Sequence, residues 1–419
     1  MRFSCSYSKL MAYLDDIAGV VEDSLVQEDA KNVIMRIAKD AEDNISVSFM
    51  GISSQIIFRR FIEPEDYQLD LNPGDLNADG IMLLMFKSKD MRGALGTYKS
   101  VRTTKVEDVI LEVVHAKLQV VVEETRIYSE EQIMELMAQP DGEEVLARRY
   151  PSKWVLDMLT VKPAQLSTIN LQAGDVEVTT FQKEFLQLHL QNLLPIVTSG
   201  TTAYSYVNFG EDFIIAQAAS LHVLMKNRIT EGGIFTNIRL VHRCFAFLDK
   251  LVTAASSIEV AKLDKYLYIR TENSESFLRY ENRAVIPPTI LKTFTRDHVV
   301  TVDRIYLKDV LKRFSYRNDT ILTTLKPEEG VLHVANSVIE QDLTINFQRG
   351  LEELSGLSFR VMPNVIDRAI IGSDDKFIMP DVQYGGDVFF YFCKGVKDYA
   401  LVFSDASGGW HSVCTVKIS

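Results

Sequence analysis

One pattern of predicted elements, found most clearly at residues 298–347, constrains the fold of this chain more than any other feature. There the sequence predicts a short strand at 299–302, a helix at 305–316, and then three strands separated by turns at 326–330 and at Ser337. Apolar residues recur in the helix at the spacing that lets one face pack on a sheet: Ile305, Leu307, Val310, Leu311 and Phe314. A basic stripe of Arg304, Lys308 and Lys312, at i, i+4 and i+8, is predicted on another face and is the first indication of a partner.

The same order of elements is predicted six times along the chain. Repetition of this kind indicates pseudo-symmetric assembly, because units with complementary sheet edges can pair and close on themselves. The other helices are expected at 9–21, about 81–98, within 181–197 with its end at Pro195, 239–252 and 361–371. The strands that follow them are expected at 33–37, 45–50 and 55–61; 109–114 and 118–123; 202–209, 213–217 and 221–226; 257–263, 265–271 and 276–282; and 387–393, 398–404 and 411–418.

A chain of 419 residues is too long for one ordinary core, so the six units are expected to group in pairs. The fold class predicted is α+β, with three domains of two units each. The boundaries expected are 1–165, 175–286 and 297–419, with a polar linker at 162–175 and Pro287 and Pro288 closing the second domain. Residues 128–150 are read as an insertion whose helix begins with a capping box at Ser129 and Gln132.

The net charge of −12 would argue against nucleic acid, because phosphates attract Lys and Arg. The charge is unevenly distributed, however. The six helix segments together carry about +7, so the rest of the chain carries about −19, and only the segment at 7–23 is negative. A basic set of helices within an acidic molecule is therefore predicted, although a solvated helix face would carry the same charges.

Several functional classes lack support in the sequence. No apolar run is long enough to span a membrane and the first ten residues lack a signal-peptide core, so a cytoplasmic protein is expected. The four cysteines are scattered and are expected to be buried thiols. No metal-type histidine pair, P-loop or nucleophile motif occurs, so neither a metal, a cofactor nor catalysis is predicted.

An apparent calcium loop begins at Asp75 and continues through Asn77, Asp79 and Gly80. Its twelfth position, which should be a bidentate Glu, is Phe86, so a turn leading into a helix at Ile81 is expected instead.

Short segments resemble motifs of the bacterial DNA polymerase sliding clamp, the beta subunit or processivity factor. FIIAQAASLHVLMKN resembles the strand-turn-strand of the family's A-T-D-G-H-R-L motif, keeping Ala216 but placing Gln217, Ala218, Ala219 and Ser220 in its polar run. NRAVIPP resembles the family's R-R-V-L-P, and HSVCTVKIS resembles its terminal V-V-M-P-M-R-L. These departures indicate a divergent member, of cellular or viral origin, and the resemblance covers nearly the whole chain apart from residues 128–150.

The resemblance implies a closed ring of two protomers joined head to tail, with helices lining the hole and sheets outside. Such a ring encircles duplex DNA without reading its sequence and tethers a replicative polymerase. It would work in the bacterial cytoplasm or, for a viral protein, in that of the infected host. The residues expected near DNA phosphates are Lys87, Lys89, Arg92, Arg239, Arg243, Arg304, Lys308, Lys312 and Arg313.

The resemblance also implies an apolar groove between the second and third domains. It would accept short peptides of the polymerase and of a clamp loader through a few hydrophobic anchors. The residues carried over by motif are Ser220, Leu221, Val285, Ile286, Val413, Val416 and Ile418. Alternating apolar residues are also how ordinary strands pack, so a purely structural role for them stays open.

Two other functional hypotheses remain at this point. A structural or interaction protein of repeated sheets, such as a virion component, would direct its basic helices toward an acidic protein. An enzyme with an unrecognised site would instead contain a deep polar pocket.

Overall fold

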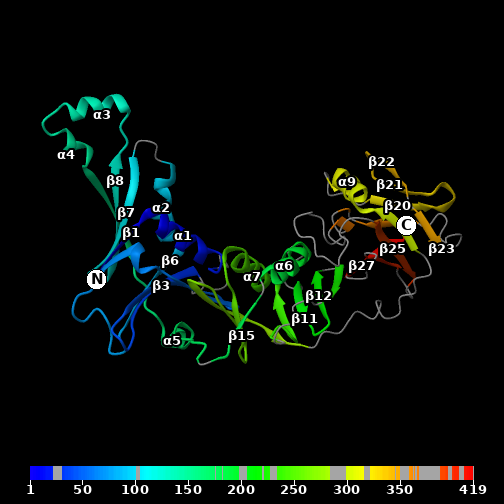
Figure 1. Cartoon of the computed structure of the whole chain (residues 1–419), viewed down its shortest axis with the longest axis horizontal. Coiled ribbons are helices and arrows are strands. Elements are labelled where there is room, and N and C mark those ends of the chain that lie inside the picture. The colour runs from blue at the N-terminus through cyan, green and yellow to red at the C-terminus, as the bar shows by residue number, and fades with distance from the viewer. Residues whose placement is uncertain are drawn as a thin grey trace. The chain divides into compact units, whose positions relative to one another are not determined.

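The computed structural model describes residues 1–21, 31–100, 104–174, 176–181, 183–197, 205–218, 221–226, 234–283, 299–315, 321–344, 346–349, 358–361, 363, 366–367, 387–394, 399–404 and 410–418. The chain forms two compact units (Figure 1). Unit 1 consists of Met1–Val178 and Ser256–Arg279, and unit 2 of Thr179–Ala255 and Tyr280–Ser419.

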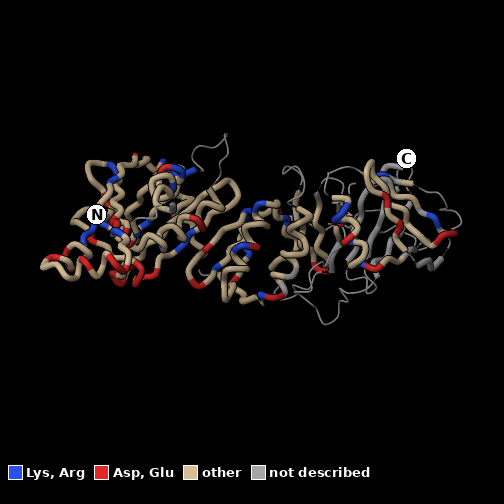
Figure 2. The backbone as a smooth tube through the Cα atoms, turned by 90° about the horizontal axis from the view of Figure 1, so that it is seen from above, with Lys and Arg blue, Asp and Glu red and all other residues tan. Residues whose placement is uncertain are grey.

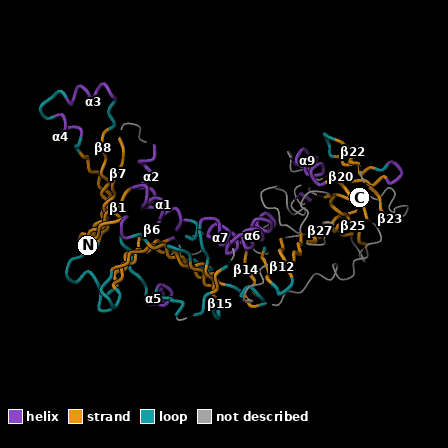
Figure 3. Tube along the Cα trace, viewed as in Figure 1, coloured by secondary structure: helices purple, strands orange, loops and turns teal. Residues whose placement is uncertain are grey.

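Unit 1 is built on two antiparallel sheets, which Figure 3 shows as the orange parts of the trace. One has the order β5 (Tyr67–Asp70), β1 (Arg2–Ser6), β7 (Thr104–Val114), β8 (Lys117–Arg126) and β9 (Arg149–Asp157). The other has the order β15 (Glu259–Lys262), β16 (Tyr266–Arg270), β17 (Ser274–Arg279), β4 (Ile56–Phe61), β3 (Ile45–Ile52), β2 (Asn32–Lys39) and β6 (Ile81–Lys87). The helices of unit 1 are α1 (Tyr7–Ala18), α2 (Ser88–Gly96), α3 (Glu130–Met137), α4 (Gly142–Leu146) and α5 (Pro163–Ile169).

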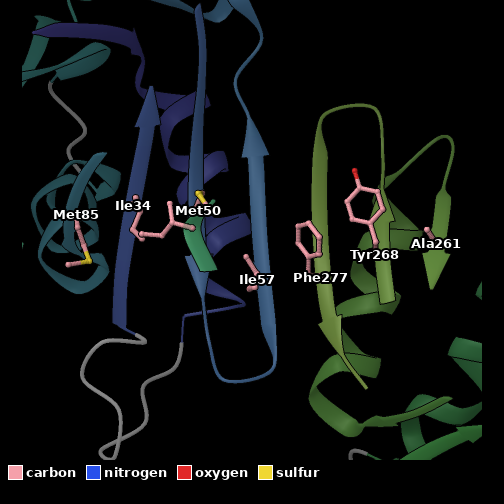
Figure 4. Packing of buried hydrophobic residues seen from close by; sticks show 8 residues of the cluster. Ile34, Met50, Ile57, Met85, Ala261, Tyr268 and Phe277 are labelled. Atoms are coloured by element: carbon pink, nitrogen blue, oxygen red, sulfur yellow. The ribbon is translucent and has the colours of Figure 1, made fainter. Parts of the chain in front are cut away.

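The second sheet of unit 1 joins strands from distant parts of the chain. The β4 strand pairs antiparallel with β17, so that Ile57 lies opposite Phe277. Around this pairing a buried apolar cluster forms, and Figure 4 shows its side chains along adjacent strands. Its members are Ile34, Met50, Ile57, Met85, Ile169, Ala261, Tyr268 and Phe277. Burial of apolar surface therefore supports the backbone ladder at this junction.

A polar contact reinforces the same junction. The buried guanidinium of Arg59, on β4, donates to the carboxylate of Glu275 on β17 and to the carbonyl oxygen of Ile169 (2.8 Å). The hydroxyl of Tyr268 donates to the other carboxylate oxygen of Glu275 at 3.2 Å. The buried charges thus have partners, as burial requires.

Unit 2 contains a larger antiparallel sheet system. Its continuous path has the order β18 (Glu281–Asn282), β14 (Ile238–Val241), β11 (Tyr206–Phe209), β12 (Phe213–Ala218), β13 (Leu221–Lys226), β27 (Trp410–Ile418), β24 (Ser358–Val361), β20 (Ile321–Lys326), β21 (Val331–Ala335) and β22 (Glu340–Thr344). From β27 a branch leads through β26 (Tyr399–Ser404) and β25 (Asp387–Lys394) to β19 (Val299–Asp303) and β23 (Asn346–Arg349). The unit also holds the short strand β10 (Thr179–Thr180) and the helices α6 (Lys183–Val197), α7 (His242–Ala254) and α9 (Arg304–Phe314).

The predicted α+β class and the repeated order of one strand, one helix and three strands are confirmed. The described elements follow this order in five repeats, ending at β4, β9, β13, β17 and β22. The sixth repeat runs from β24 to β27, and most of its predicted helix at 361–371 lies outside the described residues. The three predicted domain boundaries stay predictions.

Three local predictions were wrong. Residues 81–87 form strand β6 rather than the start of a helix, because this nearly continuous apolar run pairs with β2 at the edge of its sheet and buries Leu84, Met85 and Phe86. Part of the predicted linker forms α5, whose Ile169 is fully buried in the apolar cluster. The α6 helix continues past Pro195 to Val197, since proline already has a helical φ and only the last turn lies beyond it.

The segment that imitates a calcium loop is a turn, as expected, but it leads into β6. The side-chain oxygen of Asn77 accepts from the N–H groups of Asp79 (3.0 Å) and Ile81 (2.8 Å). The carboxylate of Asp75 lies 3.0 Å from the amino group of Met1. These side chains therefore have structural partners in the turn itself.

In the part of the chain that the structure describes, no helix has both the length and the apolar character needed to span a bilayer.

Replacing Phe277 by Ala tests the junction between β4 and β17. Phe277 is 1% exposed and its ring lies 5.0 Å from that of Tyr268. We expect the free energy of unfolding to fall by about 3–5 kcal/mol, because the substitution leaves a cavity in the cluster. Urea denaturation measures this change. Phe213→Ala, at a residue that is 38% exposed on β12, is the control and should cost about 1 kcal/mol or less. Equal losses for the two variants would contradict the assignment.

Candidate nucleic-acid interface

A basic hollow lies between α1 and α2 in unit 1. Its volume is about 800 Å³, and it brings together Lys87, Lys89 and Arg92, which the sequence analysis proposed as a group. Lys31, the residue before β2, is a fourth cation on its wall, and Asp90 is the one acidic residue among the described lining. Lys31 was not proposed from the sequence, because only the pairing of β2 with β6, in which Asn32 lies opposite Lys87, brings it to this hollow.

The N-terminus of α2 opens toward this hollow. Lys87 is the N-cap residue and makes no side-chain capping bond, so the first N–H groups of the helix keep their partial positive charge. Ser88 is buried at the first helical position and lines the hollow. Lys89 has an exposed side chain, whereas Arg92 donates to the Asp15 carboxylate of α1 at 2.9 Å. The hollow therefore carries positive potential of the kind that attracts phosphate.

The α9 helix is rotated from its predicted orientation. Its buried residues are Arg304, Leu307, Lys308, Val310, Leu311 and Phe314, so Arg304 and Lys308 are each only 8% exposed. Ile305, expected on the apolar face, is 64% exposed. Long basic side chains can lie with their methylene stems on apolar surface, which explains how two members of the stripe share the buried face. The prediction of one exposed basic stripe was therefore wrong.

The basic residues of α9 differ in their contacts: some have a charged partner close by, and others are exposed. The Lys308 amino group lies 3.7 Å from the carboxylate of Asp367. The side chain of Lys312 is 72% exposed and lies 4.0 Å from Asp309 on the same helix. Arg313 donates to the side-chain oxygen of Gln341 on β22 at 3.4 Å. Lys312 and Arg313 are the members of this group that lie on the surface, and Figure 2 colours the charged positions along the trace.

Arg239 lies on strand β14 and not on the predicted helix, which begins at His242. Its guanidinium lies 3.8 Å from the ring centre of Tyr206, and its Nε donates to Asn208 at 3.0 Å. Another of its nitrogens is 3.5 Å from Glu281. Arg239 therefore ties three strands together. Arg243 is the second residue of α7 and half-buried, and its charge assists burial in lowering the pKa of His242.

Lys183, at the start of α6, was not proposed from the sequence. Its amino group donates to the carbonyl oxygens of Ala255 (2.6 Å) and Thr253 (3.3 Å), where α7 ends. A cation at a helix C-terminus is stabilised by the free carbonyls there. Lys183 is thus part of the packing of α6 on α7.

The candidate peptide groove is described in part. Leu221 is the first residue of β13 and lies opposite Cys414 of β27, next to the pair of His222 and Val413. Val416 lies opposite Tyr399, and Ile418 opposite Phe359. The backbone therefore brings Leu221 and Val413 to adjacent strands. Ser220, Val285 and Ile286 lie outside the described residues, and the groove stays a prediction.

The described residues also include histidine, cysteine and carboxylate side chains that could form a reactive centre. None of their His, Cys, Asp and Glu side chains form a group of three or more that could hold a metal ion. Cys5 and Cys244 are buried free thiols, and burial raises the pKa of each to about 12. They are therefore inert packing residues at neutral pH.

Comparison with known proteins identifies the fold. No protein-family model matches the sequence, and no curated protein matches it. Solved structures match over all of this chain. They include a putative DNA polymerase III beta subunit from Eubacterium rectale (10% identity, 99% of that chain, TM-score 0.66) and the DNA polymerase III subunit beta from Borrelia burgdorferi (11%, 98%, 0.67). The DNA polymerase sliding clamp from Bacillus subtilis is similar to the same degree (12%, 99%, 0.66). The chain thus has the fold of these proteins along its whole length, as the sequence motifs predicted.

Charge reversal at two positions of α9 tests the rotation of the helix. We expect Lys308→Glu to lower the free energy of unfolding by about 2–4 kcal/mol, because it places a buried negative charge beside Asp367. Lys312→Glu should change it by about 0.5 kcal/mol or less, since that side chain is in solvent. Thermal and urea denaturation of both variants measure the difference. If both tolerate reversal equally, the helix has the orientation predicted from the stripe.

Proposed function

We propose that this protein is a DNA sliding clamp, which encircles duplex DNA and tethers a replicative polymerase for processive synthesis. It acts without catalysis, and we place it in the cytoplasm of a bacterium or of an infected host cell. The observation that carries the proposal is the rule by which the last strands of its repeats pair. The similarity to DNA polymerase III beta subunits supports it.

The pairing rule is simple. The last strand of repeat 1, β4, pairs with the last strand of repeat 4, β17. The last strand of repeat 3, β13, pairs with that of repeat 6, β27. Both pairings are antiparallel and continue a sheet from one repeat into another. An odd-numbered repeat therefore pairs with the repeat three positions further along.

Two strands are left over by this rule. Among the described strands, β9 of repeat 2 pairs with β8 alone, and β22 of repeat 5 pairs with β21 alone. Continuing the rule, β22 of one chain would pair with β9 of a second copy. Such a contact is head to tail and repeats until the assembly closes, which gives a ring rather than a two-fold dimer of identical surfaces. Two copies, as in our proposal, give twelve repeats.

Exposed sheet edges of this kind are otherwise a liability, because they offer free N–H and C=O groups to any strand. The side chains on these two edges are complementary in charge. The exposed Lys153 lies on β9 and the exposed Glu340 on β22, whereas Arg149 of β9 is already paired with Glu123 and Asp108 in its own unit. Pairing between copies would satisfy the backbone groups and bring opposite charges together.

Contact with DNA is proposed through cations at helix ends and on exposed helical faces. The hollow at α2, with Lys31, Lys87, Lys89 and Arg92, is the strongest candidate. Contacts of this type are independent of sequence and weaken steeply with salt, which is the behaviour sliding requires.

The proposed partners on the protein side are the polymerase and a clamp loader. Their short peptides would insert hydrophobic anchors near the β13–β27 junction, around Leu221, Val413, Val416 and Ile418. Extended peptides commonly bind where a sheet offers an apolar edge or groove.

Topological retention is the direct test of the proposed function. The protein, loaded on a nicked circular plasmid with the loader and polymerase of its source if required, should stay bound through gel filtration. It should be lost once the circle is linearised, because it slides off free ends. Light scattering on the protein alone should give twice the mass of one 47.5 kDa chain. Equal retention on circular and linear DNA, or a strict monomer at micromolar concentration, would count against a ring.

The hollow at α2 is tested by reversing two charges together. We expect the double variant Lys87→Glu and Lys89→Glu to bind a short linear duplex roughly tenfold more weakly, with a salt dependence about two units shallower. Fluorescence anisotropy over a series of salt concentrations measures both. Lys265→Glu, on the exposed turn between β15 and β16, is the matched control and should leave both values unchanged.

A further inference from the structure

The insertion in repeat 2 is a pair of helices, α3 and α4, between strands β8 and β9. Figure 1 shows them beyond the end of the β8–β9 ribbon. No residue of α3 is buried, although the helix is amphipathic. Its apolar residues Ile133, Met134 and Met137 are all exposed, Met134 by 67%, and Ile127 just before the helix is exposed as well. Exposed apolar residues gathered on one short helix indicate a surface that binds a partner.

The insertion nevertheless has a well-defined local structure. The capping box predicted at its start is present: Ser129 Oγ accepts from Gln132 N–H (3.3 Å), and Gln132 Oε1 accepts from Ser129 N–H (3.0 Å). At the start of α4, a Cβ on Gly142 would collide with the carbonyl of Leu136 in α3, so only glycine allows the two helices to approach this closely. The hairpin therefore has a defined local structure although its apolar face stays exposed. A surface that is already ordered loses little conformational entropy when it binds a partner.

The register of the sheet junctions predicts where this insertion lies in the proposed ring. At the β4–β17 junction, the turn before β17 reaches the C-terminal end of β4: Phe61 N–H donates to Asn273 C=O at 2.9 Å. At the other junction, the first residue of β27, Trp410, lies opposite Met225 near the end of β13. In both cases the start of the later strand lies beside the C-terminal end of its partner strand, as antiparallel pairing requires. By the same register, α3 and α4 would lie beside the C-terminal end of β22 in a second copy.

The surface around β22 has complementary chemistry. The α9 helix lies against this strand, because Gln341 Nε2 donates to the hydroxyl of Tyr306 (3.2 Å) and that hydroxyl donates to the carbonyl of Asp342 (3.4 Å). On its outer face α9 exposes the apolar Ile305 and Tyr306, together with Lys312 and Arg313. The α3 helix offers the matching set, apolar residues beside Glu130, Glu131 and Glu135. Apolar surface would meet apolar surface, and acidic residues would meet basic ones.

We infer that the α3–α4 hairpin docks on α9 of a second copy of this chain, as a second contact beside the pairing of β9 with β22. The inference rests on the proposed ring. It makes residues 127–148 part of the subunit interface, and it gives Ile305 and Tyr306 an apolar partner.

The test is the dissociation constant of the dimer, measured by sedimentation equilibrium on the full chain. The α3 variant combines Met134→Glu and Met137→Glu, and the α9 variant is Ile305→Glu. All three positions are exposed in the single chain, so neither variant should disturb its folding, which circular dichroism checks. The matched control is Ile45→Glu, an isoleucine of moderate exposure on β3 in unit 1.

We expect each variant to weaken the dimer about tenfold or more, and the control to leave it within about twofold. The two variants combined should lose less than the product of their separate effects, since they remove the same contact. A dimer that forms normally and is unchanged in the α3 variant overturns the inference, and so do fully multiplicative losses. If the α3 variant keeps its dimer but no longer binds polymerase, the hairpin serves another partner and the inference is likewise overturned.

These outcomes separate the inference from the proposed function. An unchanged dimer that is still retained on circular DNA rejects the docking of α3 and leaves the clamp intact. A wild-type chain that neither dimerises nor is retained rejects the ring, and with it the interface.

Discussion

The hydrogen-bonding needs of sheet edges determine how this chain is organised. A three-strand meander ends in a strand whose outer N–H and C=O groups have no partner within the repeat, and leaving such groups unpaired in a buried position is costly. At β4 and β13 the partner comes from a repeat far along the chain. The consequence is that residues 256–279 belong to the same compact unit as the N-terminal part of the chain. Sequence distance is irrelevant to a ladder of backbone hydrogen bonds once a complementary edge is available.

The junction between β4 and β17 also shows what such a pairing needs from side chains. Four of the six residues of β4 are buried, and the apolar cluster lies directly across the pairing. Arg59 is buried within it and has its charge neutralised by Glu275. Apolar burial supplies the free energy that stabilises this junction. The ion pair determines the register, because a shift of one strand along the other would leave the buried guanidinium without its carboxylate partner.

The sequence predicted the elements of this fold better than their orientation. Repeated strands were found because period-two apolar runs and turn residues are local signals, and the capping box at Ser129 is local as well. The run at 81–87 was misread because a continuous apolar stretch fits a buried strand or a helix equally, and only its pairing with β2 decides. The rotation of α9 was missed for a related reason: the stems of Arg304 and Lys308 are apolar enough to be buried, which a charge pattern does not reveal. Lys31 joins the hollow, and Arg239 joins a strand cluster, through contacts between segments that no single window contains.

The last strands that pair within the chain are more buried than the two that do not, and this difference explains why an insertion before β9 would contribute to the proposed interface. Most residues of β4 and β17 are buried, but β22 buries only Leu343 and β9 only Leu156. An edge made of β22 and β9 would therefore gain backbone hydrogen bonds and a few charge pairs, which contribute little net free energy at an exposed surface. Apolar contact can come from Tyr150, Trp154 and Val155, which β9 itself exposes, and from elements beside the strands. Beside the two edges, apolar side chains are exposed on α9 and on the turn before β22, at Val338 and Ile339, and on the α3–α4 hairpin at β9. The hairpin and α9 would each provide an apolar surface that the other lacks in its own unit.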